Sequence, residues 1–511
     1  MLLLTALMAC RHDDHPGACK TWGPEQTWLD NTMPAAIQQA FEAELAALDG
    51  DGVAWAILVD GEIRYAGAAG IKDRQGQLPM EPHTLLRSGS TLKMQTAAMV
   101  LSLEAEGLVS RDDTLGDLLP DFSMRADPGV AEQATLHELL SHQGGFVDYT
   151  PIDGPTGDVT LYNQVHDVFA RDGYMLVEPG SFYNYSNPNF VVAALAGQEA
   201  AGVPYATLMR ERIWEPLCMT RTTLEPADAL ADGEYATARG VWDANGEQRV
   251  EPDSYDSGFS RPAGFAFTST MDMLRFAHFL MEGNEDVMPK AMSDAITTAH
   301  VDTLEIPGAG LQYGYGMFLY TAYGRGQDWV EGPLWGHGGD IPGFAADLFV
   351  HPGTGVALAV LANASGAHFV DAPMAVFREL SGVASTPPPD DGLPNDPADY
   401  VGTFDESHLT GRLVFSVVDG ELYVDAPEID AADIPYEHVL QPLWEDAYLF
   451  DAQNNPIAVT FARDATGEVR WLRHRAFVAS KVDDVGIAKD EAPRPPIDAR
   501  ALRDALTALR L

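Results

Sequence analysis

The sequence predicts an α+β fold in which a large domain, with one interrupted antiparallel sheet flanked by helices, precedes a small antiparallel β domain. Helical and strand-like patterns alternate from about residue 25 to 383. A stretch rich in proline and aspartate follows, and beyond Tyr400 the pattern changes to short strands separated by turn residues. We therefore predict an N-terminal signal and tether, the large domain, a linker, the β domain and a tail, at residues 1–24, 25–383, 384–398, 399–482 and 483–511.

The large domain is predicted to begin with a helix and a hairpin. Met33–Leu48 has helical periodicity and is followed by Gly50. Residues 52–70 contain two strand-like runs joined at Asp60-Gly61, a pair that favours a tight hairpin turn. The next helix is predicted over Ser90–Gly107, which is rich in Ala, Met and Leu and ends at a glycine.

The remaining elements follow the same two periodicities. Helices are predicted through most of residues 135–285, paired strands through 336–364 and a final helix over Phe369–Leu380. Strands of the small domain are predicted at residues 413–418, 421–426, 447–451 and 457–463. From Asp498 onward, leucines at 502, 506 and 509 predict an amphipathic helix.

The charge balance excludes several classes of partner. The 511 residues include 76 acidic and 31 basic side chains, which gives a net charge of -45. Such a surface repels phosphate groups, so the composition argues against nucleic-acid binding and against attachment to anionic lipid through a basic patch. Three cysteines are too few for a disulfide-dense scaffold.

The N-terminal residues predict export and a lipid anchor. The apolar run MLLLTALMAC ends at Cys10 and resembles a bacterial lipobox, although it lacks the usual positive segment before it. Residues 11–15, with Cys19 close by, fit a flexible tether better than a metal site. In an exported protein, Cys19 and Cys218 could form a disulfide, and the sequence leaves this open.

One lysine has a serine three residues before it. On a helix, Ser90 and Lys93 share a face, so the hydroxyl and the amine can lie side by side. A lysine can take the proton of a serine nucleophile if burial or a nearby positive charge lowers its pKa. The alternative is a helix start with Ser90 as the N-cap and a solvated Lys93, since this spacing also arises by chance.

Two further motifs follow in order along the chain. Tyr185-Ser186-Asn187 lies in a turn-like stretch before a helix, where a tyrosine can carry protons and an amide can bind a carbonyl. His337-Gly338-Gly339 opens a strand after the helical region. With SxxK, YxN and HxG in this order, the chain resembles the serine β-lactamase-related family, which includes class C β-lactamases, D,D-carboxypeptidases, D-aminopeptidases and esterases.

The resemblance extends through most of the large domain. Family-like surroundings include residues 106–113, 139–142, 215–219 and 262–264. The resemblance implies a β-lactamase/penicillin-binding-protein-like domain, with an antiparallel sheet flanked by helices plus an all-helical subdomain. It also implies that Ser90 forms an acyl-enzyme and that Lys93 and Tyr185 share the general acid and base work. The backbone N–H groups of Ser90 and Asp340 are implied as the oxyanion hole.

The resemblance assigns substrate contacts to the other motif residues. Asn187, Gly338 and Gly339 are implied to bind the acyl side of the substrate. His337 stands where β-lactamases have a lysine, and is implied to bind a carboxylate or assist proton transfer. Because histidine is largely neutral above about pH 6.5, it is a weaker anchor for an anion than lysine.

Several residues near these motifs receive a structural interpretation. Gln143-Gly144 replaces two small hydroxyl residues of the family pattern, in a loop that we expect to be structural. Asp148-Tyr149 could edge the substrate cleft or belong to a solvated loop. Packing or capping is expected of the histidines at positions 137, 142, 166 and 278.

The expected function is therefore that of an exported serine hydrolase acting on an amide or ester. No metal or other cofactor is implied, and the expected partner is a small-molecule or short-peptide substrate. The alternatives are a β-lactamase proper and a binding protein that keeps the fold without turnover.

Overall fold

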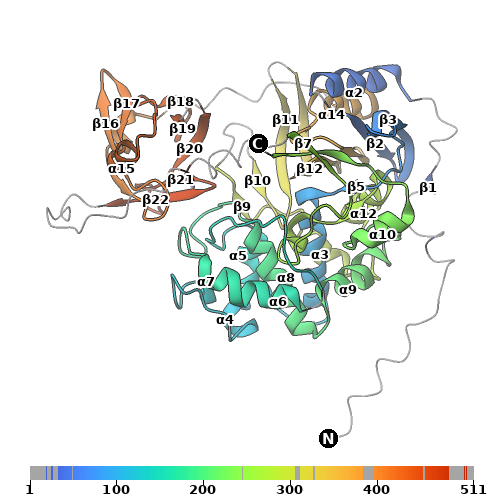
Figure 1. Ribbon diagram of the computed structural model, residues 1–511, viewed down its shortest axis with the longest axis horizontal. Helices are drawn as coiled ribbons and strands as arrows, with labels where there is room; N and C mark the ends of the chain where they lie inside the picture. The colour runs from blue at the N-terminus through green and yellow to red at the C-terminus, as the bar shows by residue number, and fades with distance from the viewer. Residues whose placement is uncertain are drawn as a thin grey trace, which may run out of the picture.

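The computed structural model confirms an α+β fold with a large domain and a smaller β domain (Figure 1). It describes residues 19, 25–26, 33–48, 50–157, 159–243, 246–304, 311–325, 328–383, 395–452, 455–482, 500 and 502. Cys10, residues 11–15, most of the predicted linker, and Leu506 and Leu509 lie outside the described residues.

A 10-stranded sheet runs through the described part of the large domain. Its strands are, in spatial order, β1 (Glu25–Gln26), β3 (Glu62–Asp73), β2 (Gly52–Val59), β14 (Val356–Ala362), β13 (Phe344–His351), β12 (Asp328–Ile341), β11 (Phe318–Arg325), β10 (Gln312–Tyr313) and β9 (Val301–Asp302), with β4 (Leu78–Pro79) beside β3. Neighbouring strands are antiparallel except β1 and β3. Because β2 pairs with β14, the N-terminal hairpin completes a sheet that the helical region interrupts, as predicted.

The hairpin turn forms where the sequence predicts it. Asp60 and Gly61 join β2 to β3 with φ angles of 52° and 79°. Both angles lie in the left-handed region that Asp and Gly tolerate, which matches the right-handed twist of paired strands.

Thirteen helices lie in the described part of the large domain, on the two faces of this sheet and in a helical region beside it (Figure 1). They are α2 (Ala35–Ala47), α3 (Leu92–Ala105), α4 (Leu115–Leu118), α5 (Leu136–Leu140), α6 (Thr160–Asn163), α7 (Ala170–Asp172), α8 (Asn187–Ala201), α9 (Tyr205–Met209), α10 (Pro226–Asp232), α11 (Arg261–Gly264), α12 (Thr270–Glu282), α13 (Lys290–Ser293) and α14 (Asp371–Ser381). The 3-10 turns are η2 (Gly89–Thr91), η3 (Ala131–Gln133) and η6 (Pro397–Tyr400), and η4 (Gln164–Phe169) and η5 (Arg210–Trp214) are π-helical segments.

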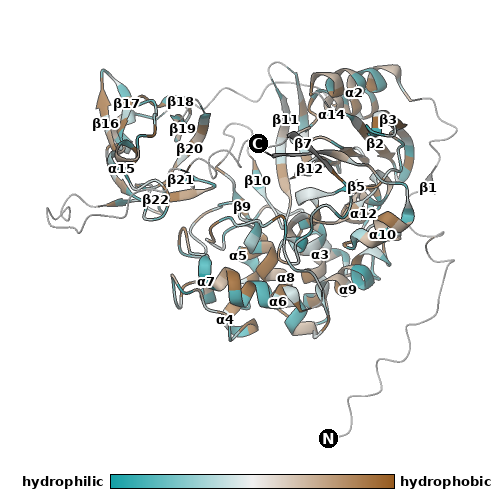
Figure 2. Cartoon of the chain, in the orientation of Figure 1, coloured by the Kyte–Doolittle hydropathy of each residue, from teal (hydrophilic) through white to brown (hydrophobic). Residues whose placement is uncertain are grey.

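The two faces of the sheet pack into two different hydrophobic cores, because successive side chains of a strand point to opposite faces. On β13, Leu348 packs into the core shared with α3, α8 and α12, and its neighbour Phe349 packs into the core shared with α2 and α14. Helix α2 carries both hydrophilic and hydrophobic residues (Figure 2) and buries Ile37 and Phe41 against the sheet. Strand β14 is apolar throughout, and β13 is apolar except for Asp347 and His351, because both faces of these strands are buried.

The helical region also contains strands that the periodicity does not predict. A hairpin joins β6 (Ala238–Asp243) to β7 (Gly246–Val250), and β5 (Leu86–Arg87) pairs with β8 (Phe267–Thr268). The sequence carries the hairpin signal Asn245-Gly246 at the first of these, which the wider helical pattern obscured.

The C-terminal domain is an 8-stranded antiparallel sheet with its own core. Its strands are, in spatial order, β17 (Glu421–Asp425), β16 (Arg412–Val418), β15 (Gly402–Asp405), β22 (Phe477–Val482), β21 (Val469–His474), β20 (Asn455–Arg463), β19 (Ala447–Ala452) and β18 (Gln441–Trp444), and α15 (Pro427–Ala431) follows β17. The four predicted strands are confirmed as β16, β17, β19 and β20. Leu502, from the predicted C-terminal helix, is buried in this core.

The disulfide that the sequence left open is present, and the described helices were also compared with the length that a membrane span needs. Cys19 and Cys218 form a disulfide, which ties the N-terminal segment to the turn after η5. In the part of the chain that the structure describes, no helix is long and apolar enough to cross a membrane.

Candidate active site

Ser90, Lys93 and Tyr185 meet at the start of α3. Ser90 lies in the turn η2, and its Oγ is 2.9 Å from Lys93 Nζ and 2.9 Å from Tyr185 Oη. Lys93 follows one turn later on α3, and Tyr185 lies two residues before α8, which packs against α3. Ser90 Oγ therefore accepts from an amine and from a phenol, two groups that can pass protons to and from it.

Lys93 is buried, so the alternative of a solvated lysine does not describe this site. Its side chain is 0% exposed, and Nζ also donates to the carbonyl of Ala263, 2.7 Å away on α11. Burial lowers the pKa of Lys93 well below its usual range, and the Arg475 cation lowers it further. Ser90 is not the N-cap of α3, since that position belongs to Thr91. A lysine in this setting can be neutral and act as a base.

The backbone around Ser90 approaches β12 unusually closely. A Cβ at Gly339 would lie 2.3 Å from Ser88 O and 2.7 Å from Ser90 N, and a Cβ at Gly89 would lie 2.7 Å from Asp340 N. Gly89 also has a φ of +49°, which side chains rarely adopt. Glycine is required at both positions, because a side chain at either would collide with the backbone of the neighbouring segment. The close approach agrees with the oxyanion hole that the family resemblance assigns to the N–H groups of Ser90 and Asp340.

His337 is neutral and satisfied within the protein. Nδ1 contacts the carbonyl of Gly338, and Nε2 lies 3.1 Å from Tyr313 Oη. Because a carbonyl only accepts, Nδ1 carries the proton and Nε2 accepts from Tyr313. Burial lowers the pKa of His337 to about 3. The ring supplies no positive charge for a substrate carboxylate at neutral pH.

A charged pair lies behind Gly338. Asp347 faces Gly338 from β13, and its Oδ1 accepts from His368 Nδ1 at 2.9 Å. Burial lowers the pKa of His368, but the Asp347 carboxylate raises it, and the result is about 9. A Cβ at Gly338 would lie 3.2 Å from both Asp347 Oδ1 and His368 Cε1, so glycine leaves room for the pair.

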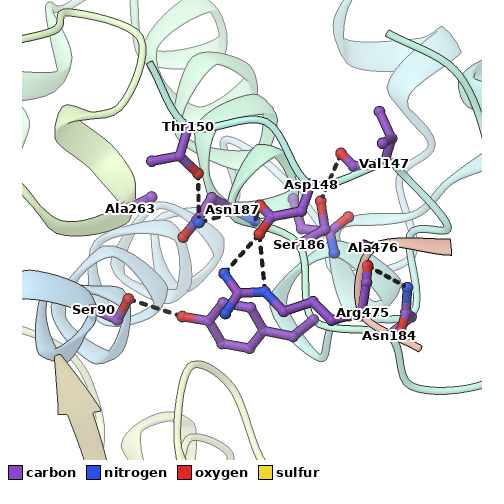
Figure 3. A network of polar contacts seen from close by, with 12 residues as sticks. Ser90, Val147, Asp148, Thr150, Asn184, Ser186, Asn187, Ala263, Arg475 and Ala476 are labelled. Carbon is purple, nitrogen blue, oxygen red and sulfur yellow. Dashed lines mark hydrogen bonds and ion pairs between the residues drawn. The ribbon is translucent and has the colours of Figure 1, made fainter. Parts of the chain in front are cut away.

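Asn187 and Asp148 form the opposite side of the site. Asn187 begins α8, and its Nδ2 donates to Asp148 Oδ1 at 3.1 Å and to Thr150 Oγ1 at 2.6 Å. The backbone N–H of Asn187 also donates to Asp148 Oδ1. Figure 3 shows this network, in which the Asp148 side chain, 11% exposed, accepts from several partners, whereas its neighbour Tyr149 is 37% exposed.

Sequence reasoning missed Arg475, which reaches this site from the C-terminal domain. It lies in the two-residue turn between β21 and β22, and its guanidinium donates to Asp148 Oδ2 (Figure 3). Arg475 Cζ also lies 4.4 Å from the centre of the Tyr185 ring. No local pattern marks this turn, because its role depends on how the two domains dock.

The expected packing role holds for His142. Its ring lies 4.1 Å from the Tyr185 ring, and Nδ1 accepts from the N–H of Ser186. Burial lowers the pKa of His142 well below its usual range, so the ring is neutral. Next to it, Gly144 fits against Asn189, whose Oδ1 would lie 2.2 Å from a Cβ at that position. This loop supports Tyr185 from behind.

A serine hydroxyl beside a buried lysine and a tyrosine, with two N–H groups nearby, defines a serine acyl-transfer site. Residues 37–381 match the Beta-lactamase family, and the chain belongs to this family. It is thus a member of a family of serine hydrolases that work through an acyl-enzyme.

Known relatives cover much of the chain. Penicillin-binding protein 4 of Amycolatopsis lactamdurans is 28% identical over 383 residues, which make up 72% of this chain and 96% of that protein. A D-aminopeptidase of Gluconobacter oxydans is 24% identical over 396 residues, 75% of this chain and 69% of that protein. The crystal structure of SurE matches with a TM-score of 0.65 at 23% identity, over 88% of this chain and 98% of SurE, which shows that the fold is shared.

Proposed function

We propose that this protein hydrolyses an amide or ester bond in a short peptide or small molecule through an acyl-enzyme on Ser90. The observation that carries the proposal is the contact of Ser90 Oγ with both Lys93 Nζ and Tyr185 Oη, each at 2.9 Å. Neutral Lys93, with Tyr185, takes the hydroxyl proton as Ser90 attacks the carbonyl carbon. The N–H groups of Ser90 and Asp340 stabilise the oxyanion. The leaving group departs with a proton, and water then releases the acyl group.

The edge of β12 supports a peptide-like substrate. In the described residues, the pairing of β11 with β12 ends at Gly336, so residues 337–341 have a strand neighbour only on the β13 side. An extended acyl group can add to such an edge by main-chain hydrogen bonds. The relatives named penicillin-binding protein and D-aminopeptidase agree with this substrate class.

The charges in the site favour neutral or cationic substrates over β-lactams. His337 is neutral, with a pKa of about 3, and the Arg475 guanidinium is already paired with Asp148. Neither of these two groups therefore offers a free cation to a β-lactam carboxylate, and the net charge of -45 opposes the approach of anions. We propose a D-amino-acid peptidase or an esterase in preference to a β-lactamase proper.

A substrate panel tests this proposal. We expect p-nitrophenyl esters or D-amino-acid anilides to be hydrolysed with a higher kcat/KM than nitrocefin. A nitrocefin kcat/KM above about 10⁵ M⁻¹s⁻¹, with the esters and anilides slower, would contradict the specificity. If no substrate turns over and a fluorophosphonate does not label Ser90, the protein is a binding protein instead.

We also propose that the protein is exported and anchored through a lipidated Cys10. The support is the lipobox-like sequence at residues 7–10 and the disulfide between Cys19 and Cys218, a bond typical of oxidising compartments. Expressed in a bacterial host with a signal segment supplied upstream, the protein should fractionate with membranes, and Cys10→Ser should release it or leave its signal uncut. Equal soluble behaviour of both forms would contradict the anchor.

A further inference from the structure

The C-terminal domain touches the catalytic domain at the segment that carries Tyr185. Arg473 Nε donates to Asn184 Oδ1 at 3.2 Å, and the Asn184 amide donates to the carbonyl of Arg475 at 3.4 Å. Phe182 packs against Trp471, with ring centres 5.3 Å apart. The residues just before Tyr185 are therefore the docking site of the β21–β22 hairpin.

We propose that Arg475 makes the C-terminal domain a working part of the active site, as a positioning residue that fixes the Tyr185 ring and keeps Lys93 in its neutral, proton-accepting form. This inference rests on the proposed function, because it concerns the same serine, lysine and tyrosine. It gives the β domain a role that its sequence pattern does not suggest.

The Arg475 guanidinium is held by its ion pair with Asp148 and lies against the Tyr185 ring. Nε and Nη2 donate to Asp148 Oδ2 at 2.9 and 2.6 Å, and only 19% of the arginine side chain and 11% of the aspartate side chain are exposed. Asp148 is held in turn by Asn187 (Figure 3). A paired and buried guanidinium of this kind keeps one orientation, with its face toward the Tyr185 ring.

The two cations lie close to one tyrosine. Arg475 Cζ is 4.4 Å and Lys93 Nζ is 5.0 Å from the centre of the Tyr185 ring. The two charges are thus less than about 10 Å apart, and at that separation in a partly buried site the repulsion of like charges shifts a titration by roughly one pH unit. Repulsion of this size favours the neutral lysine.

The other titratable groups around Lys93 do not supply this effect. The five groups that face Lys93 within the described residues are Tyr185, His142, His337, Asp148 and Arg475. Burial lowers the pKa of both histidines, that of His337 to about 3, so both rings are neutral at neutral pH. Only Arg475 and Asp148 carry charge at neutral pH, and they act on Lys93 in opposite directions.

Because Arg475 and Asp148 shift the pKa of Lys93 in opposite directions, substitutions of the two residues test the inference in the full-length protein. The rate constant for fluorophosphonate labelling of Ser90 is measured from pH 5 to 10, because it requires a neutral base but no knowledge of the substrate. Arg475→Gln should move the half-maximal pH of labelling up by about one unit. Asp148→Asn should move it down, and Arg475→Lys should keep it near the wild-type value. Arg470→Gln is the matched control, since it removes a charge of the same domain that pairs with Asp464 and Glu468.

Each result decides between the two proposals. If wild-type Ser90 is not labelled at any pH, the proposed function is wrong. If Ser90 is labelled but the Arg475→Gln profile keeps its midpoint, or if both variants shift in the same direction, the role of Arg475 is wrong. Should Arg475→Gln fail to fold by circular dichroism, Arg475→Met, which removes the charge but keeps the length of the chain, takes its place. A midpoint that moves up relative to Arg475→Lys supports the role of Arg475, and equal midpoints overturn it.

Discussion

Replacing Gly339 by alanine tests whether catalysis depends on the close contact between β12 and the backbone around Ser90. The added methyl group would lie 2.3 Å from Ser88 O and 2.7 Å from Ser90 N, both backbone atoms. Strand β12 and the turn η2 must then separate by roughly 1 Å, a displacement that costs about a hundredfold in rate when it moves a catalytic group. Loss of one oxyanion donor costs about a hundredfold to a thousandfold. We therefore expect kcat/KM to fall at least about a hundredfold.

Ester hydrolysis with a fold check measures this effect. The matched control is Gly353→Ala in the β13–β14 turn, where the nearest atom to the new Cβ, His351 Cε1, is at an ordinary 3.4 Å. The control should keep most of its activity, and Gly339→Ala should lose stability by about 1–3 kcal/mol through overpacking but stay folded. A folded Gly339→Ala variant with more than a third of the wild-type kcat/KM would refute the reasoning.

Three other substitutions have defined outcomes. Lys93→Ala should lower kcat/KM by at least about a thousandfold, and a loss below tenfold would show that another group is the base. His337→Lys should raise the ratio of nitrocefin to ester kcat/KM, and an unchanged ratio would place residue 337 away from the substrate carboxylate. His368→Gln should flatten the pH dependence of the unfolding free energy, measured by urea titration at pH 6 and pH 10. The pKa of His368 is about 9 when folded, so its stabilisation is complete below about pH 6.5 and is lost as the pH rises through 9; equal pH dependence in wild type and variant would contradict this.

Local patterns predict the parts of the fold that local interactions determine. The Asp60-Gly61 hairpin, the strands around Pro352-Gly353 and helix α3 follow from turn chemistry and periodicity. The one-turn spacing of Ser90 and Lys93 likewise places their side chains together without tertiary information.

Long-range docking produces the parts that the sequence does not reveal. Arg475 and Asp148 are 327 residues apart, and nothing near either one indicates that they pair. Strands β15, β21 and β22 are short and partly polar, so their alternation is weak until the sheet assembles. The sequence also left open whether Asp148 edges the substrate cleft or lies in a solvated loop. Its pairing with Arg475 depends on the same docking.

The measurement closest to the central claim is the site of covalent labelling. Wild-type protein treated with a fluorophosphonate is digested and analysed by mass spectrometry, beside Ser90→Ala as the control. The claim that Ser90 is the acyl-forming nucleophile predicts one adduct per chain on the peptide that contains Ser90, and none in the variant. An adduct on another residue, or equal labelling of Ser90→Ala, would contradict it.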